Sequence, residues 1–228
     1  MKMPRTERFH DSSRSPAVSG FLTQPEQPNG SGLVLTHGAG ANCDSLVLRT
    51  VADAFSEIGY TVLRCDLPFR QKHRFGPPRG NGADDREGLR NAVLALREIV
   101  SGPIFLGGHS YGGRQASMLA AEDPAICAGL LLLSYPLHPP EKPQQLRTAH
   151  FPSLCTPAFF VHGTRDPFAS SDELASALKL IAARTQVFTS EKAGHDLGFS
   201  RPAKTGLTWP SEVAAAFEAF AKSCCAVA

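Results

Sequence analysis

A serine between two glycines stands where a short apolar run gives way to a helical pattern. Gly108, Ser110 and Gly112 form a G-x-S-x-G pattern that closely follows the apolar run 104–106. On a tight turn between a strand and a helix, such a serine lifts its hydroxyl clear of the sheet, and the flanking glycines avoid steric clashes. An exposed hydroxyl of this kind can attack a carbonyl carbon. We therefore predict that Ser110 is a nucleophile.

A serine hydroxyl is a weak nucleophile near neutral pH, so it needs a histidine that takes its proton and an acid that orients the histidine. In strand-turn-helix sites of this kind, the acid and then the histidine follow the serine along the chain. Asp166 comes just beyond the buried run 158–161, and His195 lies in a glycine-bearing loop after the last apolar run. We predict Asp166 as the acid and His195 as the base.

Neighbouring histidines and acids have simpler explanations. His109 is fixed beside the serine and His162 ends a predicted strand, so we expect both to be structural. Asp172 falls in the first turn of a predicted helix, where its charge complements the helix dipole. Asp196 is adjacent to the histidine that it would have to orient.

The negative charge that develops on a carbonyl oxygen needs two backbone amides that point at it. One amide is expected from Tyr111, which follows the serine at the start of a helix. The other is expected from the segment 35–41, whose glycines let the backbone turn back toward the serine. We predict Ala39 as this second donor, with Gly40 as the alternative. His37 is expected to brace the loop.

Short apolar runs alternate with longer helical patterns along the chain, which is typical of a parallel sheet with helices packed on it. Several runs are apolar at consecutive positions, as strands covered on both faces require. We predict one α/β domain with a mostly parallel central sheet and helices on both faces. The expected strands are 33–36, 60–64, 104–106, 129–133, 158–161 and 186–189, with 17–22 as an additional edge strand.

Three helices have clear signals. An apolar stripe at helical spacing covers 89–100. Ser170 followed by Glu173 has the form of a capping box, and a last helix is expected after Pro210. The segment 67–84 is rich in proline and glycine, so we predict a loop there that reaches the active site.

Composition and charge narrow the class of protein. Lys and Arg number 23 and Asp and Glu 21, so the net charge of +2 provides no field that attracts nucleic acid or an anionic membrane. The six cysteines lack the spacing of a zinc site and the density of a disulfide scaffold. No segment resembles a secretion signal or a membrane span. We expect a cytoplasmic protein with reduced thiols that needs no metal or cofactor.

The 228 residues suit one domain, which we place at 17–223, after a flexible arm at 1–16 and before a tail at 224–228. The last four residues match the C-a-a-X prenylation pattern, but no polybasic segment supports anchoring. We interpret them as the frayed end of the last helix. The sequence leaves the oligomeric state open.

The predicted loop carries a cluster of basic side chains: Arg70, Lys72, His73, Arg74 and Arg79. A basic rim of this kind attracts carboxylate or phosphate groups of a substrate. Exposed charges are ordinary on loops, so we interpret the cluster as a solvated surface. Steering of an anionic substrate remains the alternative.

With the serine, acid, histidine and oxyanion segments in this order, the chain resembles the α/β-hydrolase superfamily over about 17–222. Within it, the segments 35–40, 135–140 and 146–150 resemble a small lidless group typified by testis-expressed protein 30, related more distantly to dienelactone hydrolases. Dienelactone hydrolases use a cysteine nucleophile, so a lactone substrate is not implied here. Some relatives are subunits of chromatin complexes, which implies a non-catalytic role as an alternative.

The resemblance implies a serine hydrolase that acts on carboxylic esters or related small acyl substrates through a covalent acyl-enzyme. Only the 22 residues 135–156 separate two predicted strands where many members insert a cap domain. We therefore expect no cap and an open site, with 135–140 and Phe168 at its rim. A small peptidase and a non-catalytic interaction subunit are the alternative functions.

Overall fold

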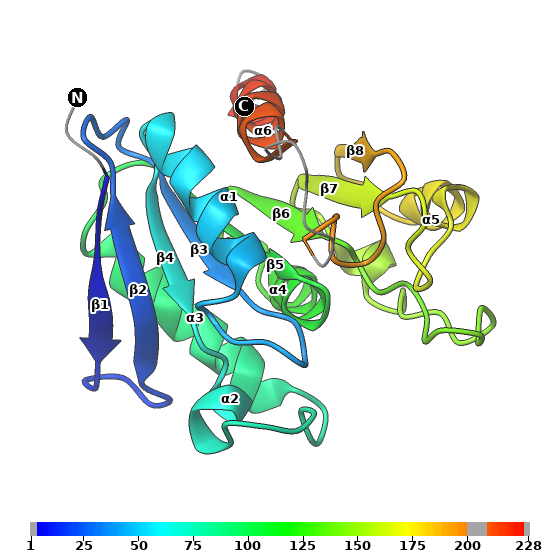
Figure 1. Cartoon of the computed structure of the whole chain (residues 1–228), viewed down its shortest axis with the longest axis horizontal. Helices are drawn as coiled ribbons and strands as arrows, with labels where there is room; N and C mark the ends of the chain where they lie inside the picture. The colour runs from blue at the N-terminus through cyan, green and yellow to red at the C-terminus, as the bar shows by residue number, and fades with distance from the viewer. Residues whose placement is uncertain (1–3, 200–208, 226–228) are drawn as a thin grey trace.

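Eight strands form one mixed sheet in the parts of the chain that the structure, a computed structural model, describes, which are residues 4–199 and 209–225 (Figure 1). β2 runs antiparallel to both of its neighbours, β1 and β4. All the other neighbouring strands are parallel to each other. The spatial order is β1-β2-β4-β3-β5-β6-β7-β8. The strands are β1 (Arg5–Asp11), β2 (Val18–Gln24), β3 (Gly32–Thr36), β4 (Thr61–Cys65), β5 (Ile104–His109), β6 (Gly129–Leu133), β7 (Ala158–Gly163) and β8 (Thr185–Ser190).

Helices cover both faces of this sheet, as predicted (Figure 1). Leu130 and Leu132 of β6 join the core beneath α3, α4 and α5, whereas Leu131 and Leu133 join the core beneath α1 and α6. Successive side chains of a strand point to opposite faces, so a strand buried on both sides is apolar throughout. The helices are α1 (Leu46–Glu57), α2 (Pro68–Lys72), α3 (Ala83–Arg97), α4 (Tyr111–Glu122), α5 (Ser171–Leu178) and α6 (Trp209–Cys225).

The strand order reverses around β3, which lies between β4 and β5 and is parallel to both. In an open parallel sheet, ligands bind in the crevice at the carboxyl ends of the strands where such a reversal occurs. The loops that follow β3, β5, β7 and β8 all leave from this edge. The fold therefore brings the segments that carry the predicted site residues to one place.

The N-terminal segment contains a strand where a flexible arm was expected, so that prediction is wrong for residues 5–11. β1 pairs antiparallel with β2 along its whole length, from Arg5 opposite Gln24 to Asp11 opposite Val18. Its side chains are mostly polar, and Phe9 is the one that packs against the core. Backbone pairing needs no apolar pattern, which is why the sequence did not reveal this strand. β2 is consequently an inner strand and not the predicted edge.

The segment predicted as a loop at 67–84 is partly helical. It begins with α2, whose first residue, Pro68, occupies a position where a missing N–H costs no helical hydrogen bond. It ends with the first two residues of α3, and 73–82 between the two helices is irregular. Proline at the start of a short helix and proline in a loop look alike in the sequence.

Two further expectations for the fold are confirmed, the capping box and the missing cap domain, whereas the last helix begins at Trp209 and not after Pro210. The Ser170 and Glu173 side chains form the reciprocal capping box at the start of α5. Between β6 and β7, the segment 134–157 contains a single 3-10 turn, η1 (Phe151–Ser153), and no cap domain. α6 ends at Cys225, and the other residues of the prenylation pattern, 226–228, lie outside the described residues. None of the described helices is both long and apolar enough to cross a membrane.

Candidate active site

Ser110 lies in a strained turn between β5 and α4. Its φ of 52° and ψ of −117° belong to a region that residues with a side chain rarely adopt. Its amide donates a hydrogen bond of 2.8 Å to the carbonyl of Leu133, which ties the turn to β6. A Cβ on Gly112 would lie 2.6 Å from the His37 carbonyl oxygen, so the start of α4 approaches the loop after β3 only because glycine is there.

A continuous row of hydrogen bonds joins the serine, the histidine and the aspartate. Ser110 Oγ lies 2.8 Å from His195 Nε2, and His195 Nδ1 lies 2.8 and 3.0 Å from Oδ2 and Oδ1 of Asp166. A carboxylate can only accept, so Nδ1 carries the ring proton and Nε2 accepts from the serine hydroxyl. In this tautomer the histidine can take the serine proton. The structure thus brings the three predicted residues together.

The carboxylate of Asp166 is shielded from water. Its side chain is fully buried, whereas that of His195 is 21% exposed. Asp166 Oδ1 also accepts a hydrogen bond of 2.9 Å from the amide of Phe168, whose ring packs against the His195 ring with centroids 4.1 Å apart. Low local polarity strengthens the interaction between the carboxylate and the imidazole.

His109, which was expected to be structural, holds the loop that carries His195. Its Nε2 donates a hydrogen bond of 2.8 Å to the backbone carbonyl of His195. Burial lowers the pKa of His109 to about 4, so the ring is neutral near pH 7. The same loop touches the end of β7, where a Cβ on Gly163 would lie 2.5 Å from the Ala193 carbonyl oxygen. The sequence offered no sign of either contact beyond the position of His109 next to Ser110.

The loop after β3 is braced from two sides. His37 Nε2 accepts a hydrogen bond from the amide of Leu67 at 3.2 Å, so Nδ1 carries the proton that is donated to the Gly38 carbonyl at 2.9 Å. The guanidinium of Arg70 donates to the carbonyl of Ala39 at 2.6 Å. The predicted bracing role of His37 is therefore seen in the structure, and Arg70 shares it.

Arg70 corrects the interpretation of the basic cluster. Its side chain is buried and donates to four backbone carbonyls, those of Ala39, His73, Arg74 and Gly76. It is therefore not part of a solvated surface or of a basic rim. The other four members of the cluster are exposed.

A cleft of about 630 Å³ opens beside Ser110. Backbone from the loop after β3 and from Tyr111 borders it, and neither the Ala39 nor the Tyr111 amide donates to a protein group among the described residues. The segment 135–140 contributes Pro136 and not Tyr135 or Leu137, which are buried in the core. The lining residues are Gly38, Ala39, Gly40, Ala41, Pro77, Pro78, His109, Ser110, Tyr111, Arg114, Pro136, Arg147, Phe168 and His195.

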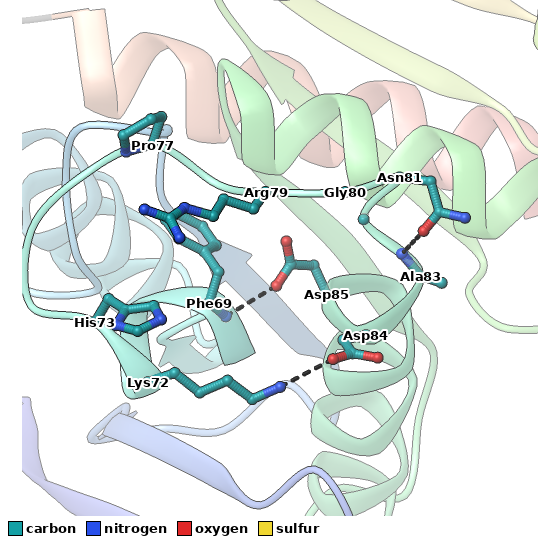
Figure 2. Close-up of a pocket in the computed structure, with 11 residues that line it drawn as sticks. Phe69, Lys72, His73, Pro77, Arg79, Gly80, Asn81, Ala83, Asp84 and Asp85 are labelled. Carbon is teal, nitrogen blue, oxygen red and sulfur yellow. Dashed lines mark hydrogen bonds and ion pairs between the residues drawn. The ribbon is translucent and has the colours of Figure 1, made fainter.

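A second cavity, of about 320 Å³, lies between α2 and α3 (Figure 2). Figure 2 shows the carboxylate of Asp85 turned toward the backbone of Phe69, which donates to it at 3.1 Å, and the ion pair of Lys72 with Asp84. The second oxygen of Asp85 accepts a hydrogen bond of 2.7 Å from the hydroxyl of Tyr111. Sequence reasoning missed this buried carboxylate, which ties α2 and α3 to the residue after the serine. Within the described residues, no three His, Cys, Asp or Glu side chains are grouped to hold a metal ion.

A parallel sheet with a serine on a sharp strand-to-helix turn, and a histidine and an acid that follow it in the chain, defines the class of α/β hydrolases. The chain belongs to the alpha/beta hydrolase domain family, whose model matches residues 29–224.

Solved structures of the same fold come from several bacteria. A homologue of α/β serine hydrolases from Coxiella burnetii is 18% identical over 86% of this chain and 91% of its own, with a TM-score of 0.70. A dienelactone hydrolase from Anabaena variabilis is 20% identical over 93% and 96%, with a TM-score of 0.73. A serine hydrolase without a lid from Xanthomonas campestris is 14% identical over 87% and 88%, with a TM-score of 0.63. The family and the shared fold support a hydrolase.

Proposed function

We propose that this protein is a serine hydrolase that cleaves carboxylic esters or related acyl substrates through a covalent acyl-enzyme on Ser110. The observation that carries this proposal is the row of hydrogen bonds from Ser110 Oγ through His195 to Asp166. The buried carboxylate holds the imidazole in the tautomer that accepts the serine proton. A scaffold without chemistry has no physical need for this combination of groups.

In the first half of the reaction, Ser110 Oγ attacks the acyl carbon while its proton moves to His195 Nε2. The amides of Ala39 and Tyr111, with Gly40 as the alternative to Ala39, donate to the oxygen that becomes negative. Collapse of the tetrahedral intermediate breaks the bond to the leaving group, which takes the proton from His195. The acyl group is then bound to Ser110.

In the second half, a water molecule attacks the acyl-enzyme and passes its proton to His195. Collapse of the second intermediate releases the carboxylic acid and returns the proton to Ser110 Oγ. Asp166 stays ionised throughout and stabilises the imidazolium that forms twice in each cycle. No group besides the side chains, two backbone amides and water is needed.

Labelling with a fluorophosphonate tests this proposal directly, because the probe reacts with an activated serine. We expect labelling of the native protein at Ser110 and none of Ser110→Ala, whose kcat on p-nitrophenyl esters should fall by about 10³-fold or more with unchanged folding. Dipeptide anilides in the same screen distinguish a peptidase. Absence of both labelling and turnover in the native protein would favour a non-catalytic interaction subunit. The closer kinship with the testis-expressed protein 30 group and a cytoplasmic location stay predictions.

A further inference from the structure

Two arginines line the cleft that contains Ser110. Arg114 is on α4, one helical turn after the serine, and Arg147 is on the segment between β6 and β7. Both side chains are half-buried. The long segment 115–146 separates them along the chain, so only the fold brings both to the same cleft.

Neither arginine has an acidic partner. No Asp or Glu oxygen of the described residues lies within 4.0 Å of either guanidinium, and the undescribed segments 1–3, 200–208 and 226–228 contain no Asp or Glu. The Nε of Arg114 is buried and has no hydrogen-bond acceptor among the described residues. By contrast, Arg86 and Arg90 nearby on α3 pair with Glu122 and Asp123.

The surroundings of the pair add positive and neutral groups. Burial and the nearby charge of Arg114 lower the pKa of Arg147. Burial, followed by the charges of Arg114 and Arg86, lowers the pKa of His150 to about 4, so this ring is neutral near pH 7. The buried acid on this side, Asp85, already accepts hydrogen bonds from Tyr111 and Phe69. Holding two like charges together is unfavourable unless an anion joins them.

The backbone of both arginines is firmly held. The amide of Arg147 donates to the Leu137 carbonyl, and its own carbonyl accepts from the Tyr135 hydroxyl, each at 2.8 Å. The amide of Arg114 donates to the Ser110 carbonyl at 3.0 Å, and its carbonyl accepts from Ser117 Oγ at 2.9 Å. The backbone from which each guanidinium extends is thus fixed, and Arg147 Nη1 also donates to the Pro136 carbonyl at 3.4 Å.

We propose that Arg114 and Arg147 together bind an oxyanion of the substrate, a carboxylate or a phosphate group, and that the preferred substrates are anionic acyl compounds. This inference rests on the proposed hydrolase function. A guanidinium presents a planar fork of donors that matches carboxylate and phosphate oxygens. Four residues of α4 advance about 6 Å along its axis, so the anionic group lies a few bonds from the acyl carbon that Ser110 attacks.

Matched substrates measure this preference. The p-nitrophenyl monoester of adipic acid and p-nitrophenyl hexanoate have six-carbon acyl chains that differ in a terminal carboxylate, and p-nitrophenyl 5-phosphonopentanoate replaces it with a phosphonate. A second arm compares 4-acetoxybenzoate with phenyl acetate, which places the charge on the leaving group. The pair of esters with the largest preference for the anionic member identifies the kind of anion. It also shows whether the acyl group or the leaving group carries this anion.

The variants are Arg114→Gln, Arg147→Gln and, as a matched control, Arg74→Gln, which removes an exposed positive charge from the neighbouring loop 73–82. In the preferred arm, we expect each cleft variant to lower kcat/KM for the anionic ester by about 10- to 100-fold and for the neutral ester by less than about 3-fold. Arg74→Gln should leave the ratio unchanged. An unchanged ratio in both cleft variants, or an equal change in Arg74→Gln, would overturn the proposal.

Binding without turnover separates this proposal from the hydrolase function. In Ser110→Ala, adipate and inorganic phosphate are titrated by calorimetry, and saturable binding of one of them should disappear when Arg114→Gln is added. If the native protein is labelled by the fluorophosphonate but shows neither binding nor preference, the anion site is wrong and the hydrolase stands. If labelling and turnover both fail while binding depends on Arg114, the hydrolase is wrong and the anion site stands. Arg147→Gln serves the same test if Arg114→Gln does not fold.

Discussion

The Nε2 of His109 donates a hydrogen bond of 2.8 Å to the backbone carbonyl of His195. The residue immediately before the serine therefore positions the loop whose histidine side chain is hydrogen-bonded to that serine. This contact links the turn that contains Ser110 to the backbone of His195. It does so in addition to the hydrogen bond between the two side chains. It also explains why a neutral, half-buried imidazole stands at this position.

Removal of the hydrogen-bond donor His109 should lower kcat more than it changes KM. We expect His109→Leu to lower kcat on p-nitrophenyl butyrate by about 10- to 100-fold with little change in KM, because displacing a catalytic group by about 1 Å costs that much. His109→Gln retains an amide donor and should recover part of the loss. Steady-state kinetics of both variants make the comparison. Equal kcat in His109→Leu and the native protein would show that the loop holds itself.

Acid should destabilise the protein between pH 6.5 and 4. Burial lowers the pKa of His37, His109, His150 and His162, to about 4 for His109 and His150, whereas a histidine in the unfolded chain titrates near 6.5. In this window the unfolded chain binds more protons than the folded protein. The histidines therefore make their whole contribution to the free energy of unfolding above pH 6.5, and this contribution decreases as the pH is lowered. The fall is at most about 1.4 kcal/mol per pH unit for each of the buried histidines His37 and His162, and smaller for the half-buried His109 and His150.

Urea denaturation at pH 7.5, 6.0 and 5.0 measures this slope. His150→Gln should make the slope shallower, because one group that resists protonation is gone. The matched control is His73→Gln, an exposed histidine on the loop 73–82. A free energy of unfolding that stays constant or increases toward pH 5 would contradict the expected sign.

A side chain at residue 163 should separate the acid from the base. The Cβ of Gly163→Ala would lie 2.5 and 2.6 Å from the carbonyl oxygens of Ala193 and Gly194, so the loop that carries His195 must shift. We expect a stability loss of about 1–3 kcal/mol in urea and a loss of kcat. Gly40→Ala, whose Cβ meets nothing within 4 Å, is the control for folding stability. Comparable stability of the two variants would argue against tight contact.

Loss of the Arg70 guanidinium should affect all substrates alike. Arg70→Met leaves the carbonyls of Ala39, His73, Arg74 and Gly76 without a shared donor, so the loop after β3 and the loop 73–82 lose their common anchor. We expect lower kcat on neutral and anionic esters by the same factor, and faster proteolysis within 73–82. A selective loss on anionic esters would instead indicate that Arg70 contacts substrate.

Substitution of the Tyr111 side chain should spare the chemistry, since the proposed role belongs to its backbone amide. Tyr111→Phe removes the hydrogen bond to Asp85 and should cost about 1–3 kcal/mol of stability, because a buried carboxylate loses one of its two donors. The value of kcat should stay within about 3-fold of the native one. Thermal or urea unfolding and ester kinetics check both parts, and a loss of kcat by 100-fold would assign a direct role to the hydroxyl.

Features carried by adjacent residues were predictable from the sequence. The glycines around Ser110, the capping box at Ser170 and the apolar runs of the inner strands express backbone preferences and burial that act within a few positions. The chain order of serine, acid and histidine then identified Asp166 and His195, because parallel strands deliver their carboxyl ends to one edge. Where no local pattern existed, as in the polar strand β1, the prediction of a flexible arm was wrong.

Ser110, Asp166 and His195, together with the parallel sheet that aligns them, could thus be inferred from residue types, spacing and order alone. Only the tertiary structure showed that Arg70 points inward to the Ala39 carbonyl, that His109 holds the backbone of His195, and that Arg114 and Arg147 both line the cleft. The members of these three pairs are 31, 86 and 33 positions apart in the sequence. No local preference encodes such pairs, because the packing of whole elements decides which side chains meet.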